Sequence, residues 1–82
     1  MKTYLITYST GGEWEYTCKS LLAAKQKASR HFDFASRLNG VYCIIYLDGR
    51  AVARHNGGEE RQWLRQDALD FYHPNNTTIQ GG

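Results

Sequence analysis

The sequence of 82 residues has one proline, two cysteines and no long hydrophobic run. Its longest apolar stretch, residues 41–47, is far shorter than the ~20 residues that a membrane-spanning helix needs, so we expect no membrane contact. Two cysteines are too few to cross-link a small secreted domain, and we interpret Cys18 and Cys43 as buried hydrophobic residues. Residues 1–8 turn polar too soon for a signal peptide, which favours a cytoplasmic location.

The composition indicates a folded chain. Hydrophobic residues make up 41% of the sequence and charged residues 22%, which is typical of a globular protein. A chain of this length has room for one hydrophobic core. We therefore expect a single globular domain at residues 1–73. Residues 74–82 carry no charge and few apolar side chains, which predicts a flexible C-terminal tail.

Alternating patterns predict two β-hairpins. Residues 3–9 and 13–19 alternate and are separated by Gly11-Gly12, a tight turn signal. Residues 41–47 are apolar at nearly every position, which favours a central strand covered on both faces. Asp48-Gly49 then predicts a two-residue turn into a partner strand at 50–55.

A helix is predicted between the two hairpins, with Ser20 as its N-cap. One side of this helix is apolar and should lie on the sheet: Leu21, Ala24, Ala28 and Phe32. The other side is polar and basic: Lys25, Gln26, Lys27 and Arg30. Lys25 lies at the border, where its aliphatic stem can pack while its ammonium group reaches solvent.

Residues 59–72 fit two structures. Their apolar spacing favours a second helix with acidic residues in its first turn, whereas residues 61–65 also suit a short fifth strand. The helix is the preferred interpretation. The predicted fold is therefore α+β: a small antiparallel sheet of four to five strands in ββαββ order, one helix packed on a face, and a second C-terminal helix.

Residues suited to catalysis or metal binding are sparse. The histidines and cysteines lack the spacing of a zinc site, and the glycine pairs lack the frame of a phosphate loop. We interpret His31 as a surface residue, His55 as a turn residue, and the pair Glu13 and Glu15 as solvated carboxylates on an edge strand. The sequence thus predicts no catalytic residue, no metal ligand and no cofactor, and favours a binding protein over an enzyme.

Charge is uneven along the chain. Residues 19–38 contain five basic side chains and one acidic one, whereas residues 59–72 contain four acidic and two basic ones. A basic helix could follow nucleic-acid phosphates while strand aromatics stack on bases: Tyr4, Tyr8, Trp14, Tyr16, Tyr42 and Tyr46. The same residues are equally explained as core aromatics and a solvated helix face. Composition alone selects no ligand.

The helix segment resembles one small anti-CRISPR family. Its pattern is Ser-Leu-x-x-Ala-Lys-x-x-Ala-Ser followed by a basic residue, carried by Ser20, Leu21, Ala24, Lys25, Ala28, Ser29 and Arg30. This pattern is similar to that of phage-encoded inhibitors of type I-F surveillance complexes, which place a short helix on a curved antiparallel sheet. Residues 20–30 carry the resemblance closely, and the following hairpin is similar in layout only.

The resemblance implies a non-enzymatic inhibitor acting in the host bacterial cytoplasm. In that family, basic helix residues contact the backbone subunits of the RNA-guided CRISPR-Cas complex beside the groove for target DNA. The resemblance assigns this role to Lys25 and Arg30. Gln26 stands at the position where the family has a second basic residue, and Lys27 is the next residue. Two alternatives stay open: a nucleic-acid-binding module using the same face, and an accessory protein that dimerises through an edge strand.

Overall fold

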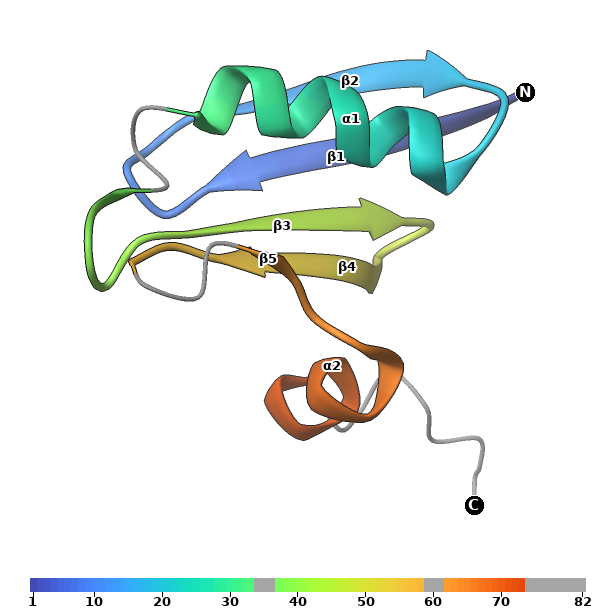
Figure 1. Cartoon of the computed structure of the whole chain (residues 1–82). Helices are drawn as coiled ribbons and strands as arrows, with labels where there is room; N and C mark the ends of the chain where they lie inside the picture. The colour runs from blue at the N-terminus through green and yellow to red at the C-terminus, as the bar shows by residue number, and fades with distance from the viewer. Residues whose placement is uncertain (34–36, 59–61, 74–82) are drawn as a thin grey trace.

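The computed structural model describes residues 1–33, 37–58 and 62–73. Five strands form one antiparallel sheet in the order β2-β1-β3-β4-β5, with two helices (Figure 1). In chain order the elements are β1 (Lys2–Tyr8), β2 (Glu13–Cys18), α1 (Leu21–Phe32), β3 (Tyr42–Leu47), β4 (Arg50–Asn56), β5 (Gln62–Trp63) and α2 (Gln66–Tyr72). The α+β class and the small antiparallel sheet are confirmed. The element order is ββαβββα, so the predicted ββαββ core is followed by both a fifth strand and a C-terminal helix.

Both predicted hairpins are present. β1 pairs with β2 from Lys2 opposite Cys18 to Thr7 opposite Glu13. β3 and β4 are joined by Asp48 and Gly49, which have φ angles of 54° and 81° and so form the expected two-residue turn. Because β1 pairs with β3 as well, the two hairpins make one continuous sheet.

Helix α1 covers one face of this sheet. Ser20 caps the helix by accepting a hydrogen bond from the Ala23 amide at 3.2 Å, as predicted. Ala24 and Ala28 are fully buried, and their small side chains let the helix lie close to the strands. Phe32 closes the core at the end of the helix. The strand side of this core consists of Tyr4, Ile6, Cys18, Cys43, Ile45 and Ala53.

The burial of the two cysteines and of the central strand also agrees with the prediction from the sequence. Cys18 and Cys43 are free and buried, as predicted. In β3, Cys43 and Ile45 belong to the core under α1, while Ile44 is buried on the opposite face. No helix in residues 1–33, 37–58 or 62–73 has the length and apolarity needed to cross a membrane.

The C-terminal segment differs from the preferred prediction. Residues 62–63 form a short strand and the helix begins only at Gln66. The Leu64 amide donates to the Arg54 carbonyl at 2.8 Å, and this pairing with β4 keeps the chain extended. The apolar spacing of Trp63, Leu64, Ala68 and Phe71, which favoured one helix over this segment, does not form a buried stripe: Phe71 is 81% exposed, and Leu69 is the buried residue of α2. Residues 59–61 and the predicted tail 74–82 lie outside the described residues.

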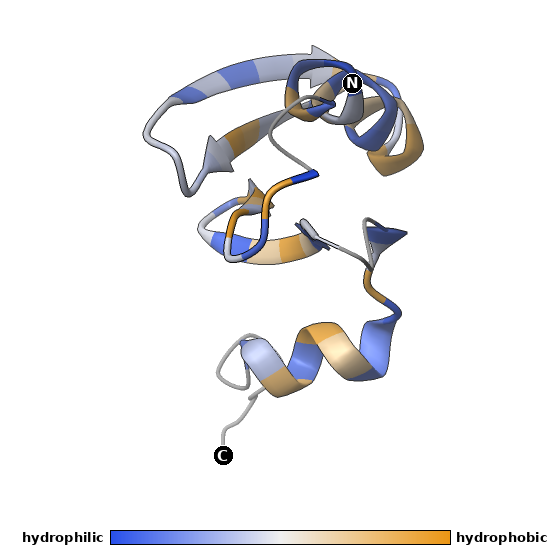
Figure 2. Cartoon of the chain, turned by 60° about the vertical axis from the view of Figure 1, so that its left-hand side comes forward, coloured by the Kyte–Doolittle hydropathy of each residue, from blue (hydrophilic) through white to orange (hydrophobic). Residues whose placement is uncertain are grey.

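Helix α2 is attached to β4 by a stack of side chains. The Arg54 guanidinium carbon lies 4.1 Å from the centroid of the Tyr42 ring and 4.3 Å from that of Tyr72. Asn56 accepts a hydrogen bond from Arg54 Nε at 2.9 Å, which fixes the guanidinium plane. This contact places α2 at the end of the molecule opposite β2 (Figures 1 and 2). Figure 2 also shows hydrophilic and hydrophobic residues alternating along α2.

The interpretation of His55 as a turn residue is wrong. His55 lies inside β4 and is 8% exposed. Its ring meets Phe32 and Trp63 edge to face, with centroid distances of 5.5 and 5.1 Å. Burial lowers the pKa of His55, because the imidazolium form loses its hydration there. The ring therefore acts as a core aromatic that joins α1, β4 and β5.

Candidate binding surface on helix α1

The four predicted site residues lie on α1, and three of them, Lys25, Gln26 and Arg30, line one groove. Lys25 leans towards β5, with Nζ 5.8 Å from the centroid of the Trp63 ring. Lys27 leans the other way, with Nζ 5.7 Å from the centroid of the Tyr16 ring in β2. Gln26 and Arg30 are exposed between them. The cations thus border two different surfaces, one on each side of the helix.

The first surface is a groove between α1 and β5, which we call the α1–β5 groove. It has a volume of about 450 Å³ and is lined by Leu22, Lys25, Gln26, Ser29, Arg30 and Trp63. Trp63 Nε1 donates a hydrogen bond to Ser29 Oγ at 3.1 Å, which holds the indole against the helix. Leu22 is 63% exposed, an unusual position for a leucine at the centre of a basic helix face. The groove therefore combines apolar surface with two cations.

Trp63 is the residue of this groove that the sequence did not assign. Its neighbours in the chain suit both a helix and a strand, and only the pairing of β5 with β4 brings it beside α1. The available signal was an aromatic residue flanked by polar and charged positions, Gln62 and Arg65. Such a pattern marks a half-buried side chain without naming its neighbour.

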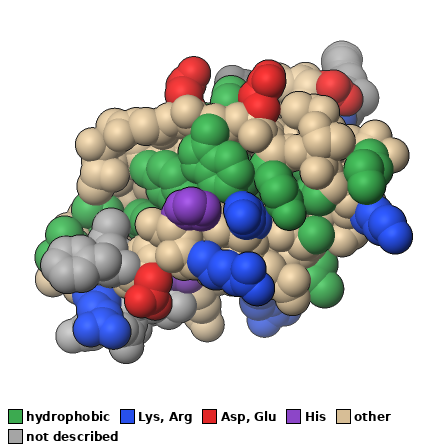
Figure 3. All heavy atoms as spheres, turned by 90° about the horizontal axis from the view of Figure 1, so that it is seen from above, with side chains coloured by type: hydrophobic (Ala, Val, Ile, Leu, Met, Phe, Trp, Pro, Cys, Tyr) green, Lys and Arg blue, Asp and Glu red, His purple; other side chains and the backbone are tan. Residues whose placement is uncertain are grey.

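The second surface lies between α1 and β2. Trp14 meets His31 edge to face at a centroid distance of 5.0 Å, and its Nε1 donates to the Tyr8 hydroxyl at 3.3 Å. Tyr16 packs against Trp14 at 5.8 Å and carries Lys27 over its ring. Figure 3 shows hydrophobic side chains on this side of the molecule, with acidic side chains along one border and a histidine, basic side chains and one further acidic side chain along the other.

The strand aromatics do not form an open platform for bases. Tyr4 is 3% exposed in the core, and Tyr8, Trp14 and Tyr16 pack against that core on the face covered by α1. On the opposite face, the Tyr42 ring is covered by Arg54. Base stacking needs an accessible ring face. The arrangement therefore weakens the nucleic-acid interpretation, which relied on exposed aromatics.

The described acids of the C-terminal segment do not pair with α1. These acids, Asp67 and Asp70, belong to α2, and Asp67 lies 4.0 Å from Arg65 of the same segment. Within residues 1–33, 37–58 and 62–73, Lys25 and Lys27 form no side-chain ion pair, whereas Asp33 lies beside Arg30 at the end of the helix. Among the described residues, the charges of Lys25 and Lys27 are thus left for a partner.

The titratable groups of the core are poorly placed for chemistry. Burial raises the pKa of the Cys43 thiol to about 12, so it stays protonated near neutral pH. The described part of the chain contains no group of three or more histidine, cysteine or acidic residues arranged to hold a metal ion. The Cys43 thiol is therefore not activated as a nucleophile.

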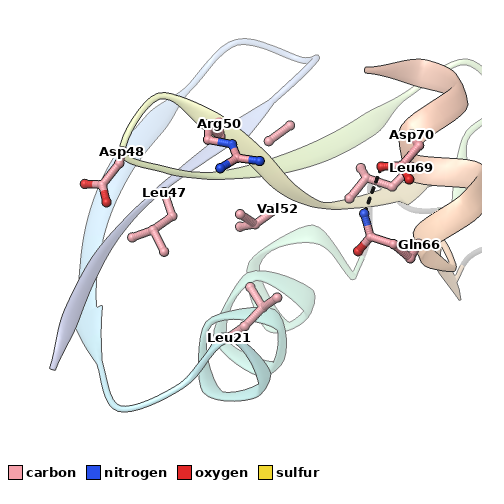
Figure 4. A pocket seen from close by; sticks show the side chains of 9 residues that line it. Leu21, Leu47, Asp48, Arg50, Val52, Gln66, Leu69 and Asp70 are labelled. Carbon is pink, nitrogen blue, oxygen red and sulfur yellow. Dashed lines mark hydrogen bonds between the residues drawn. The ribbon is translucent and has the colours of Figure 1, made fainter. Parts of the chain in front are cut away.

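A second hollow lies between α2, the β3–β4 hairpin and the start of α1 (Figure 4). It measures about 510 Å³, and Leu21, Leu47, Val52 and Leu69 supply its apolar wall. Gln66 Nε2 donates to Asp70 Oδ1 at 2.9 Å on its rim, so these two polar groups satisfy each other. Asp48, Arg50 and Asp70 are the charged residues of its lining.

Comparison of the chain with protein-family models, curated proteins and solved structures finds no match.

Proposed function

We propose that the chain is a non-enzymatic inhibitor from a phage or mobile element that binds an RNA-guided CRISPR surveillance complex through α1. The observation that carries the proposal is the α1–β5 groove. Its floor is the Trp63 ring, around which stand Leu22, Lys25 and Arg30. Buried tryptophan and arginine residues beside apolar surface are the usual centres of protein–protein interfaces.

A protein partner suits this surface better than nucleic acid alone. Leu22 offers exposed apolar area that phosphates cannot use. Lys25 and Lys27 are half-buried and lean in opposite directions, so few cations can follow one strand of phosphates. Backbone subunits of a nucleoprotein complex would provide apolar pockets and acidic side chains together. The resemblance in residues 20–30 points to the same class of partner.

The proposed mechanism is steric. The inhibitor docks α1 beside the groove in which target DNA pairs with the guide RNA, and the DNA is then unable to enter. Complementary charge accelerates such an encounter at low salt. Inhibition by occupation requires no bond to be made or broken, and it would take place in the host bacterial cytoplasm, where the complex resides.

The first test is capture from the lysate of a bacterium carrying a type I-F complex, with and without nuclease treatment. Wild type is compared with Lys25→Glu/Arg30→Glu. A matched control, Lys2→Glu/Arg65→Glu, makes the same change in net charge at exposed positions outside α1. The proposal predicts that the surveillance complex is retained after nuclease treatment by wild type and the control, and is lost with the α1 variant.

Two outcomes would overturn the proposal. Retention of nuclease-sensitive material alone would identify a nucleic-acid-binding module. Equal retention by the α1 variant and wild type would place the interface elsewhere on the chain. Circular dichroism of each variant checks that the fold is intact.

A further inference from the structure

Strand β2 leaves one side of its backbone unpaired. It is the first strand in the sheet order, so β1 is its neighbour on one side and no described strand lies on the other. The hairpin is closed by the bond from the Tyr8 amide to the Gly12 carbonyl at 3.0 Å. Hydrogen-bonded and non-hydrogen-bonded residue pairs alternate in an antiparallel ladder. The backbone amides and carbonyls of Trp14 and Tyr16 are therefore the ones that bond to β1.

The same alternation directs the other backbone groups outward. Glu13, Glu15 and Thr17 stand in the non-bonded pairs with β1, so their amides and carbonyls face the free edge. These groups form a row of donors and acceptors suited to another strand. β2 has no proline or bulge to block such pairing, two devices that commonly protect an edge.

The side chains on the two faces of this edge differ in character. Glu13 and Glu15 are exposed on the face away from α1. Trp14 and Tyr16 are half-buried on the other face, next to His31 and Lys27. Figure 3, which views this side of the molecule, shows the resulting order of acidic, hydrophobic and basic side chains. A strand lying here would meet carboxylates on one face and aromatic rings on the other.

We propose that the free edge of β2 binds an extended segment of a partner protein as an added strand. Lysine or arginine residues at alternate positions of that segment would lie beside Glu13 and Glu15. Apolar residues between them would cover the exposed edges of Trp14 and Tyr16. Main-chain bonds supply the affinity of this recognition mode, and the alternating side chains supply the specificity.

Pairing with a second copy of the chain is disfavoured in one register. Antiparallel pairing of two β2 strands about Glu15 would set two Glu15 carboxylates opposite each other, and like charges in that position are destabilising. The acidic row therefore disfavours self-pairing about Glu15, and its charge suits a basic segment. This surface is separate from the α1–β5 groove, so its test does not depend on the proposed function.

The test is a titration of the ¹⁵N-labelled full chain with short capped peptides, followed by NMR. One peptide alternates lysine with valine, and the matched control alternates glutamate with valine. The lysine peptide is expected to shift the amides of Glu13, Glu15 and Thr17 and to slow their exchange with solvent. The lysine peptide should bind at least about ten-fold more tightly than the glutamate peptide. The reason is that its ammonium groups attract the carboxylates of Glu13 and Glu15, whereas glutamate side chains repel them.

Two kinds of variant distinguish the contribution of the main-chain hydrogen bonds to peptide binding from that of the carboxylates. Glu15→Pro removes an outward amide without breaking the ladder to β1, and should abolish binding of the lysine peptide. Glu13→Gln/Glu15→Gln keeps every amide and should weaken binding about three- to ten-fold. If Glu15→Pro lowers the melting temperature, Glu13→Pro at the start of the strand serves in its place. The proposal is overturned if neither peptide binds, if both bind equally, or if a folded proline variant still binds.

Discussion

Trp63 donates a hydrogen bond to Ser29 across 34 residues of sequence, from Nε1 to Oγ at 3.1 Å. This bond connects the shortest strand of the sheet to the middle of α1. The indole then serves both as the cover of the His55 ring and as the floor of the α1–β5 groove. The groove therefore exists only while β5 is docked.

Removal of this bond should loosen β5. Ser29→Ala leaves the half-buried indole N–H without its partner and should lower the free energy of unfolding by about 1 kcal/mol. Trp63→Ala removes the ring as well and should cost about 2–3 kcal/mol. Urea denaturation followed by circular dichroism measures both. A Trp63→Ala protein as stable as wild type would show that β5 is not held by this contact.

Stability should fall in mild acid. Burial lowers the pKa of His55 below its ordinary value of 6.5, so the unfolded state binds the proton more tightly than the folded state. Above pH 6.5 His55 is neutral in both states, and the free energy of unfolding does not depend on its protonation. As the pH falls through 6.5 towards the folded-state pKa, the unfolded state is protonated first, and the free energy of unfolding decreases. The slope should reach at most about 1.4 kcal/mol per pH unit.

The check for His55 is urea denaturation between about pH 8 and about pH 5.5, a range in which carboxylates stay ionised. His55→Gln should flatten the profile. Burial also lowers the pKa of His73, beside Arg54, so part of the slope should persist until His73 is replaced as well. A profile that is identical in wild type and His55→Gln would contradict the assignment.

Cys43 should resist alkylation in the folded protein. With a thiol pKa of about 12, only about one molecule in 10⁴ carries the thiolate near pH 8. In a Cys18→Ala background, iodoacetamide should label Cys43 slowly in buffer and rapidly in guanidinium chloride. Mass spectrometry gives both rates, and rapid labelling in buffer would show that the core under α1 is open.

The attachment of α2 should depend on Tyr72 and not on its neighbour. Tyr72→Ala removes one ring from the Arg54 stack and should cost about 1 kcal/mol. Phe71 is 81% exposed, so Phe71→Ala should change stability by less than about 0.5 kcal/mol. Hydrogen exchange at the Leu69 amide, which bonds to the Arg65 carbonyl at 2.9 Å, reports local opening of α2. Equal exchange in both variants would contradict this account.

Local patterns predicted the first part of the fold well. Ser20 as the cap, Ala24 and Ala28 as the buried stripe, and Asp48-Gly49 as the turn all follow from interactions within a few residues of chain. Such short-range preferences can be identified without knowledge of the tertiary structure. The start of the helix and both hairpins were accordingly predicted to within a few residues.

The predictions that were wrong depend on contacts between distant segments. Trp63 is extended because β4 pairs with it, and His55 is buried because Phe32 and Trp63 enclose it. The opposite lean of Lys25 and Lys27 likewise depends on which strand flanks each side of α1. No periodicity in the sequence encodes these neighbours, so the sequence could not show that Lys25 approaches Trp63 while Lys27 approaches Tyr16.

The central claim is that α1 blocks access of target DNA to a surveillance complex. The most direct measurement is binding of labelled target duplex to purified type I-F complex in the presence of increasing amounts of the chain. Wild type and Lys2→Glu/Arg65→Glu should abolish DNA binding at the same concentration, and Lys25→Glu/Arg30→Glu should need at least about ten-fold more. Full DNA binding at saturating wild-type protein, or equal inhibition by the α1 variant, would contradict the claim.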